Sequence, residues 1–303
     1  MDGLRARLFD LLGLSPERPE PARAVVVSEK SVAGGKVIEL QIDGRPATFL
    51  TPGGNPPALL YCHAHGGQYE LGRRELMHGA SWLSAPWGEE LLAAGFAALC
   101  VDMPGFGDRI CEGRESALAK AGLWRGRPLF GQMIGDLQLA LGWLVESEMV
   151  DVGRIAAMGV SMGAAHAFWL AALDDRVGAV LQFCVLSDVA TMIDSGAHDR
   201  HGLYLVVPGL LECADMGDVA ARVAPRPQLI AYGEQDILTP QCARDRALAR
   251  VRRAYRRSAA LRVVADPEVG HHETPPMRRA AFSFLSDWVN GAFAGPELRG
   301  IPS

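Results

Sequence analysis

The sequence carries a serine between two glycines, in the segment Gly159-Val160-Ser161-Met162-Gly163, which matches the pattern G-x-S-x-G. An apolar segment, RIAAM, comes before it, and an alanine-rich segment, AAHAFWLAAL, follows it. This order predicts a strand, a sharp turn and a helix, and the small residues let the flanking backbones approach closely. The hydroxyl would then be exposed at a helix N-terminus, where the helix dipole favours developing negative charge. We therefore predict a nucleophile at Ser161, with an ordinary glycine-rich turn as the alternative.

A serine is a poor nucleophile until a positioned base takes its proton, and a carboxylate commonly orients that base. Asp236 comes at the end of the apolar segment PQLIAYG, and His271 comes in a loop after LRVVADPEV. Both follow predicted strands, so both are expected at the edge of the sheet where Ser161 lies. We predict that Asp236 holds the imidazole of His271 and stabilises its charged form.

Neighbouring residues leave alternatives open for the base and the acid. His272 directly follows His271, so either histidine can be the base. Asp188 follows the apolar segment VGAVLQFCVL, and Asp266 precedes the histidine loop.

An acyl-transfer reaction also needs backbone N–H groups that bind the oxyanion of the tetrahedral intermediate. One donor is expected at Met162, the residue after the nucleophile. A second is expected in the loop 65–68, where glycines follow the apolar run PALLYCHA and let the backbone approach a substrate. His63 and His65 are expected to organise this loop. The two histidines lack a convincing third ligand, so no metal is expected at this loop.

Strands and helices alternate along most of the chain. This alternation predicts an α/β protein with a mostly parallel central sheet and helices on both faces. Residues 1–30 are expected to form an N-terminal helix and a linker, and 31–303 a single catalytic domain. Two long stretches rich in Gly, Pro, Asp and Arg, about 103–130 and 186–225, follow predicted strands and are expected to be lid-like insertions beside the site.

The composition excludes several classes of function. The 303 residues are 49% hydrophobic, enough for a large core, and the net charge of −5 offers no large positive field for nucleic acid. The N-terminal segment is too short and too charged for a signal peptide, and no later segment reaches about 18 uninterrupted apolar residues, so no membrane partner is expected. The six cysteines are scattered without metal-binding spacing, which favours reduced thiols and a cytoplasmic location. The N-terminal helix is a candidate homodimer contact.

The chain resembles the α/β-hydrolases, and within them the dienelactone-hydrolase-like serine esterases and acetylesterases. The matching segments occur in the family's order and span residues 59–277: HAHGGQYELGRREL, VDMPGFGDR, GVSMG, APRPQLIAYGEQDILTP and GHHETPPM. Dienelactone hydrolase itself has a cysteine nucleophile. A serine in its place shifts the expectation towards carboxylic esters.

The resemblance implies roles for particular residues. The matching context GEQDILTP favours Asp236 as the acid, and the family's histidine directly after a glycine favours His271, which follows Gly270. It also favours Gly67 as the second oxyanion donor, with Gln68 as the alternative.

The expected function is hydrolysis of a small carboxylic ester through an acyl-enzyme, with no cofactor. Cleavage of an amide or an acyl-peptide by the same three side chains is the first alternative. A non-catalytic binding protein that keeps the fold is the second.

Overall fold

The apolar runs of the sequence lie side by side in one sheet. In the computed structural model, which describes residues 2–256 and 259–293, nine strands form this sheet in the order β1-β2-β3-β5-β4-β6-β7-β8-β9. Strands β1, β2, β3 and β5 pair antiparallel, and every pair from β5 to β9 is parallel. The strands are β1 (Ala24–Val32), β2 (Gly35–Ile42), β3 (Arg45–Thr51), β4 (Ala58–Cys62), β5 (Ala97–Val101), β6 (Ile155–Val160), β7 (Ala179–Phe183), β8 (Gln228–Gly233) and β9 (Leu261–Asp266). The predicted mostly parallel sheet is confirmed.

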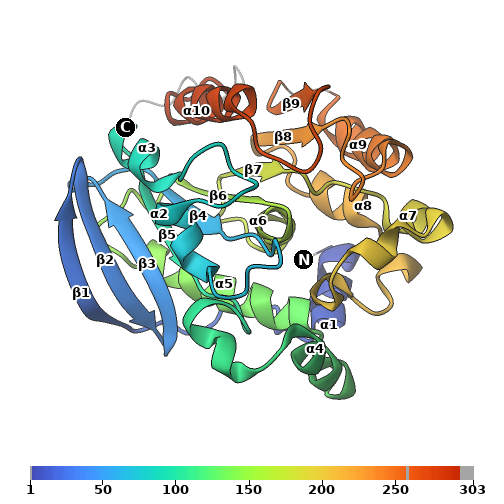
Figure 1. Ribbon diagram of the computed structural model, residues 1–303, viewed down its shortest axis with the longest axis horizontal. Helices are drawn as coiled ribbons and strands as arrows, with labels where there is room; N and C mark the ends of the chain where they lie inside the picture. Colours follow the sequence, from blue (N-terminus) through green and yellow to red (C-terminus); the bar gives the residue numbers. More distant parts are fainter. Residues whose placement is uncertain (1, 257–258, 294–303) are drawn as a thin grey trace.

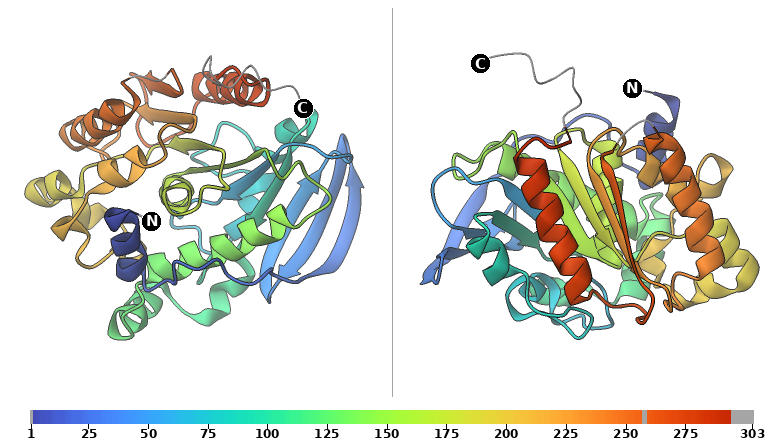
Figure 2. Two further views of the ribbon diagram at one scale, coloured as in Figure 1. Left: turned by 180° about the vertical axis from the view of Figure 1, so that it is seen from behind. Right: turned by 90° about the horizontal axis from the view of Figure 1, so that it is seen from above.

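Helices cover both faces of the sheet, which is why its inner strands are apolar on both sides. One face packs against α1 (Gly3–Leu12), α5 (Leu129–Val145), α6 (Met162–Leu173), α8 (Met216–Ala221) and α9 (Gln241–Tyr255). The other packs against α2 (Glu75–His78), α3 (Gly88–Ala93) and α10 (Pro275–Val289). In Figure 1, α10 and α5 lie on opposite sides of the central strands, and the right-hand view of Figure 2 shows α10 running along the sheet.

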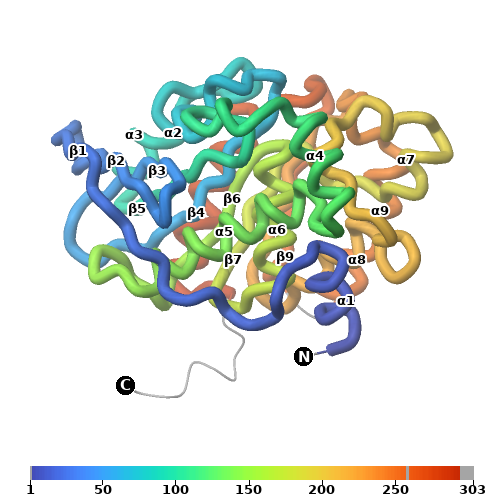
Figure 3. Tube along the Cα trace, turned by 90° about the horizontal axis from the view of Figure 1, so that it is seen from below, coloured from blue at the N-terminus to red at the C-terminus, as the bar shows by residue number. Residues whose placement is uncertain are grey.

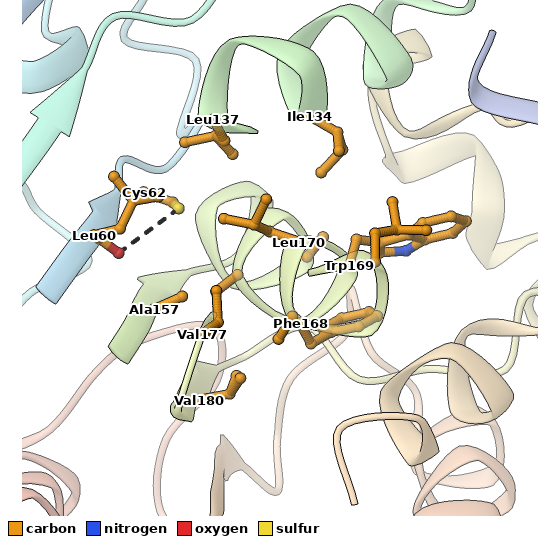
Figure 4. Packing of buried hydrophobic residues seen from close by; sticks show 14 of the residues in the cluster. Leu60, Cys62, Ile134, Leu137, Ala157, Phe168, Trp169, Leu170, Val177 and Val180 are labelled. Atoms are coloured by element: carbon orange, nitrogen blue, oxygen red, sulfur yellow. Dashed lines mark hydrogen bonds between the residues drawn. The ribbon is translucent and has the colours of Figure 1, made fainter. Parts of the chain in front are cut away.

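Helix α6 is the most deeply packed helix of the described chain, since every one of its residues is buried. Figure 4 shows Phe168, Trp169 and Leu170 of this helix between α5 and the strands. A helix that is apolar on all sides must be enclosed on all sides. The sequence AAHAFWLAAL therefore fixes α6 in the interior, and with it the position of the turn at its N-terminus.

Both long insertions contain helices, and both follow carboxyl ends of strands. The first, after β5, contains α4 (Glu115–Trp124) and a 3-10 turn, η2 (Gly107–Glu112). The second, after β7, contains α7 (Val189–Ser195), three 3-10 turns, η3 (Ala197–Arg200), η4 (Leu203–Leu205) and η5 (Leu210–Glu212), and helix α8. In Figure 3, α2 and α7 lie along the upper side of the molecule, and α4 runs from that side towards α1.

The N-terminal region departs from the expectation in two respects. Residues 24–30, assigned to a linker, lie in β1, so the expected boundary after residue 30 falls inside a strand. This strand is at the edge of the sheet and Val25, Val26 and Val27 are exposed, so no buried apolar pattern marks it in the sequence. Helix α1, expected outside the catalytic domain, packs Leu8, Phe9 and Leu12 into the core of that domain. At the other end, residues 294–303 of the expected domain lie outside the described residues.

Two glycines of α5 test how tightly α1 is held. A Cβ at Gly131 would overlap the carbonyl oxygen of Leu12, whereas a Cβ at Gly142 would meet no atom within 4 Å. We expect Gly131→Ala to lower the free energy of unfolding by about 1–3 kcal/mol, since α1 must shift. The matched control, Gly142→Ala, should leave it unchanged or raise it by about 0.5–1 kcal/mol, because alanine favours the helix. Urea unfolding measures both, and equal effects at the two positions would contradict the packing described.

Candidate active site

Ser161 occupies the sharp turn that the sequence predicts. It lies between the end of β6 and the first residue of α6, and its backbone has φ 54° and ψ −119°. Positive φ is rare for a residue with a Cβ and stores strain. The turn is held on both sides, since the Ser161 N–H donates to the carbonyl of Phe183 at 2.9 Å and its own carbonyl accepts from the Ala165 N–H at 3.0 Å.

The two glycines of the motif have a steric reason. A Cβ at Gly159 or at Gly163 would overlap the carbonyl oxygen of Cys62 at the end of β4. Small residues at both positions let β4, β6 and α6 meet at the turn. Met162 is the first residue of α6, where helix N–H groups have no acceptor within the helix.

Asp236 and His271 form a hydrogen-bonded pair. The Nδ1 of His271 lies 2.7 Å from the Oδ2 of Asp236. Asp236 is buried, and it also accepts hydrogen bonds from the N–H of Leu238 and the hydroxyl of Thr239, each at 2.8 Å. Burial opposes its ionisation, but the hydrogen bond and charge interaction with His271 outweigh burial and hold the pKa of Asp236 below its usual value. The carboxylate is therefore ionised and only accepts, so Nδ1 of His271 carries the proton.

The other ring nitrogen of His271 points to no partner. Its Nε2 is buried and makes no hydrogen bond to any described residue, Ser161 included. Catalytic hydrogen bonds are often long in the absence of substrate and shorten when it binds. The Nε2 is thus the nitrogen able to accept a proton.

The residues that the sequence offered as alternative base and acid do not join the Asp236–His271 pair. His272 is exposed, whereas its neighbour His271 pairs with Asp236. Asp188 caps α7 through the N–H of Thr191 and forms an ion pair with Arg250 at 3.0 Å. Asp266 accepts from the hydroxyl of Thr274 at 3.0 Å.

Sheet order brings the predicted residues to one edge. Strands β6, β7, β8 and β9 are parallel neighbours in that order. Ser161 follows β6, Asp236 follows β8, and His271 follows β9. Because neighbouring strands are about 4.8 Å apart, the ends of β6 and β8 are separated by roughly two such steps. The imidazole of His271, bonded to Asp236, is therefore the group suited to span this separation.

The loop after β4 contains the predicted second oxyanion donor. Gly66 and Gly67 both have positive φ, +48° and +71°. The Gly67 N–H donates to Nδ1 of His65 at 3.0 Å, and the Gln68 N–H donates to the carbonyl of His65 at 3.1 Å. Both predicted amides therefore have an acceptor within their own loop. His63 is buried, and its Nε2 accepts from the Met103 N–H at 3.1 Å.

In the described part of the chain, no group of three His, Cys, Asp or Glu side chains could hold a metal ion. Within the same residues, no helix is long and apolar enough to cross a membrane.

Two comparisons with known sequences place the chain in a family. Residues 85–198 match the family model described as "Dienelactone hydrolase family". The Bacillus subtilis (strain 168) protein "Putative hydrolase YtaP" is 36% identical over 296 residues, which covers 94% of this chain and 98% of that protein. The chain belongs to the dienelactone hydrolase family.

Solved structures support the fold of this dienelactone hydrolase family member. An acetyl xylan esterase from Paenibacillus sp. R4 aligns with a TM-score of 0.64 at 21% identity, covering 93% of this chain and 92% of that chain. A glucuronoyl esterase from Solibacter usitatus aligns with a TM-score of 0.65 at 15% identity, covering 93% and 91%. At such low identity the likeness shows the α/β-hydrolase fold alone, and that predicted fold is confirmed.

Sequence reasoning missed a buried carboxylate beneath the glycine loop. Glu75 is fully buried and accepts from the hydroxyl of Tyr61 at 2.6 Å, the Nε1 of Trp82 at 3.1 Å and the N–H of Ala64 at 3.1 Å. Burial raises its pKa to about 7, although these donors act in the opposite direction. A lone glutamate in the charged segment ELGRREL has no sequence signal that distinguishes it from a surface residue.

The raised pKa of Glu75 predicts a pH-dependent stability. In the unfolded chain Glu75 has its ordinary pKa of 4.5, and in the folded protein about 7. As pH rises, the unfolded chain therefore loses this proton at a lower pH than the folded protein does. The contribution of Glu75 to the free energy of unfolding falls as pH rises between the two pKa values and is constant above them. We expect the difference in unfolding free energy between the wild type and Glu75→Gln to fall by about 1–3 kcal/mol from pH 5 to pH 8. Urea unfolding at both pH values measures it, and a difference that does not change with pH would contradict the assignment.

Proposed function

We propose that this chain is a serine esterase that cleaves a small carboxylic ester through an acyl-enzyme. The observation that supports this most strongly is the pair of buried Asp236 and half-buried His271 at the sheet edge where Ser161 stands in its strained turn. The Nε2 of His271 has no hydrogen-bond partner among the described residues. Membership of the dienelactone hydrolase family supports the same class of chemistry.

In the proposed mechanism, Ser161 Oγ attacks the ester carbonyl while Nε2 of His271 takes the hydroxyl proton. Asp236 keeps the proton on Nδ1 and stabilises the imidazolium without taking that proton. His271 then protonates the leaving alcohol. Water, activated by the same imidazole, attacks the acyl-enzyme and releases the acid, which restores Ser161.

The oxyanion is proposed to bind the N–H of Met162 and a second N–H from the glycine loop. Gly67 remains the preferred residue, with Gln68 as the alternative. Since the Gly67 N–H donates to His65 in the structure, it must exchange that acceptor for the oxyanion, which its positive φ and exposed position allow.

A cavity between the two insertions is the proposed substrate site. Its volume is about 700 Å³, and its lining includes Tyr69, Ile110, Arg114, His201 and Leu203. This size suits a small ligand. It adjoins the Asp236 loop, because Nε2 of His201 lies 2.8 Å from the carbonyl of Leu238, whose N–H in turn donates to Asp236.

The proposed setting is cytoplasmic, with a small-molecule ester as partner. All six cysteines lie in the described part of the chain and none forms a disulfide there, which supports a reducing compartment.

Removal of the nucleophile tests the proposal. We expect Ser161→Ala to lower kcat on p-nitrophenyl acetate by about 10⁴-fold or more, because no other hydroxyl stands in this turn. Full activity in the folded variant would reject the assignment.

The two adjacent histidines provide a matched pair of variants. His271→Asn should lower kcat by about 10³-fold or more through loss of the base. His272→Asn should stay within about threefold of the wild type, since His272 is exposed and its neighbour holds Asp236. The reverse pattern in steady-state assays would show that His272 is the base.

Parallel assays with p-nitrophenyl acetate and p-nitroacetanilide separate ester from amide cleavage. We expect turnover of the ester with little of the anilide. Comparable turnover of both would instead favour an amidase, and failure of a fluorophosphonate probe to label the wild type would favour a non-catalytic protein.

A further inference from the structure

His65 joins the glycine loop to the first insertion. Its Nε2 lies 2.6 Å from Oε2 of Glu115, the first residue of α4, and its Nδ1 accepts from the Gly67 N–H at 3.0 Å. An ionised carboxylate only accepts, so Nε2 carries the proton and Nδ1 is the acceptor. The imidazole therefore spans from α4 to the loop that carries the proposed oxyanion donor.

Glu115 gathers three segments of the chain. Besides His65 it accepts from the hydroxyl of Tyr69 at 3.0 Å and from the N–H of Tyr204, in η4 of the second insertion, at 3.1 Å. It is buried, and burial raises its pKa, but these donors, His65 first, outweigh burial and keep the pKa below its usual value. A buried carboxylate stays ionised only while its hydrogen-bond partners stay in place.

Aromatic rings fix the orientation of the His65 imidazole. Tyr204 stacks on it, with ring centres 5.3 Å apart and planes at 27°. Tyr69 and Phe106 contact it edge-on at 5.0 and 5.2 Å. The ring is thus held by both insertions, although the proposed mechanism gives it no part in proton transfer.

We propose that His65 and Glu115 are positioning residues for the oxyanion hole. When the Gly67 N–H turns to the oxyanion, the Gln68 N–H still donates to the carbonyl of His65 at 3.1 Å, so His65, held by Glu115, keeps the loop in place. The pair thereby ties the loop to the two insertions that line the cavity. This inference rests on the proposed esterase function. It implies that the insertions which select the substrate also place the donor that stabilises its transition state.

The effect should appear in kcat, because an oxyanion donor acts on the transition state and not on the bound substrate. A lost donor lowers kcat by about 10²–10³-fold, and a displaced donor should cost part of that.

Three variants test the pair. His65→Phe keeps the aromatic packing and removes both ring nitrogens, and Glu115→Gln leaves one acceptor oxygen for three donors. Glu112→Gln is the control, because it makes the same carboxylate-to-amide change in the first insertion at a residue that binds Arg109 and not His65. The assay measures kcat on p-nitrophenyl acetate for each serine titrated by a fluorophosphonate. We expect kcat of His65→Phe and Glu115→Gln to fall about 10–100-fold, with KM within about threefold of the wild type. In the control, kcat should stay within about threefold of the wild type.

A purely structural role predicts a different pattern. His65→Phe and Glu115→Gln would then lose thermal stability, while their folded, titratable fraction would keep the wild-type kcat, and this result would overturn the inference. If His65→Phe does not fold, His65→Gln, which retains a donor and an acceptor, replaces it. A wild-type kcat in Glu115→Gln would then overturn the inference, since His65→Gln can keep both hydrogen bonds.

The wild type and Ser161→Ala, assayed in parallel, separate this inference from the proposed function. No ester turnover by the wild type, or turnover unchanged in Ser161→Ala, refutes the esterase. Turnover that depends on Ser161 but not on His65 or Glu115 refutes the positioning role alone.

Discussion

The left-handed backbone of Ser161 is the constraint around which the site is built. A residue with a Cβ in this conformation costs about 1–3 kcal/mol and persists only where the surroundings over-determine it. Here the surroundings are α6, buried on every side, and the close meeting of β4, β6 and α6 that only glycine at 159 and 163 allows. The packing of the core thereby stabilises the strained backbone conformation of Ser161.

The Asp236–His271 pair depends on the same sheet. Parallel strands bring their carboxyl ends to one edge, so a loop after β8 and a loop after β9 can meet near a turn after β6. Burial of Asp236 makes each of its hydrogen bonds stronger, because the local dielectric is low, and the same burial would be costly without them. The hydrogen bonds of Asp236 to Leu238, Thr239 and His271 therefore hold the loops after β8 and β9 together.

The first insertion adds a second buried carboxylate, that of Glu115. Glu115 connects α4, η4 and the glycine loop, so the walls of the cavity and the proposed oxyanion donor form one connected unit. In the proposed mechanism, substrate selection and transition-state stabilisation are linked through His65. A rigid sheet with variable insertions that reach the site is how one fold supports different substrates.

Most of the fold could be predicted from the sequence, since buried parallel strands and α6 have unmistakable apolar patterns. The turn at Ser161 and the positions of Asp236 and His271 followed from strand ends and from the family resemblance. Strand β1 was missed because it is exposed at an edge. The sequence left His271 and His272 open, because only the path of the loop decides which ring meets Asp236. Glu75 and Glu115 were missed because burial of a lone glutamate arises from tertiary packing that no local pattern records.

The most direct measurement is the mass of the intact protein after reaction with a fluorophosphonate, followed by peptide mapping. We predict one adduct, on Ser161, that forms at a greatly reduced rate in His271→Asn and at the wild-type rate in His272→Asn. An adduct on another residue, or labelling of Ser161 that does not depend on His271, would contradict the proposal that these two side chains act together.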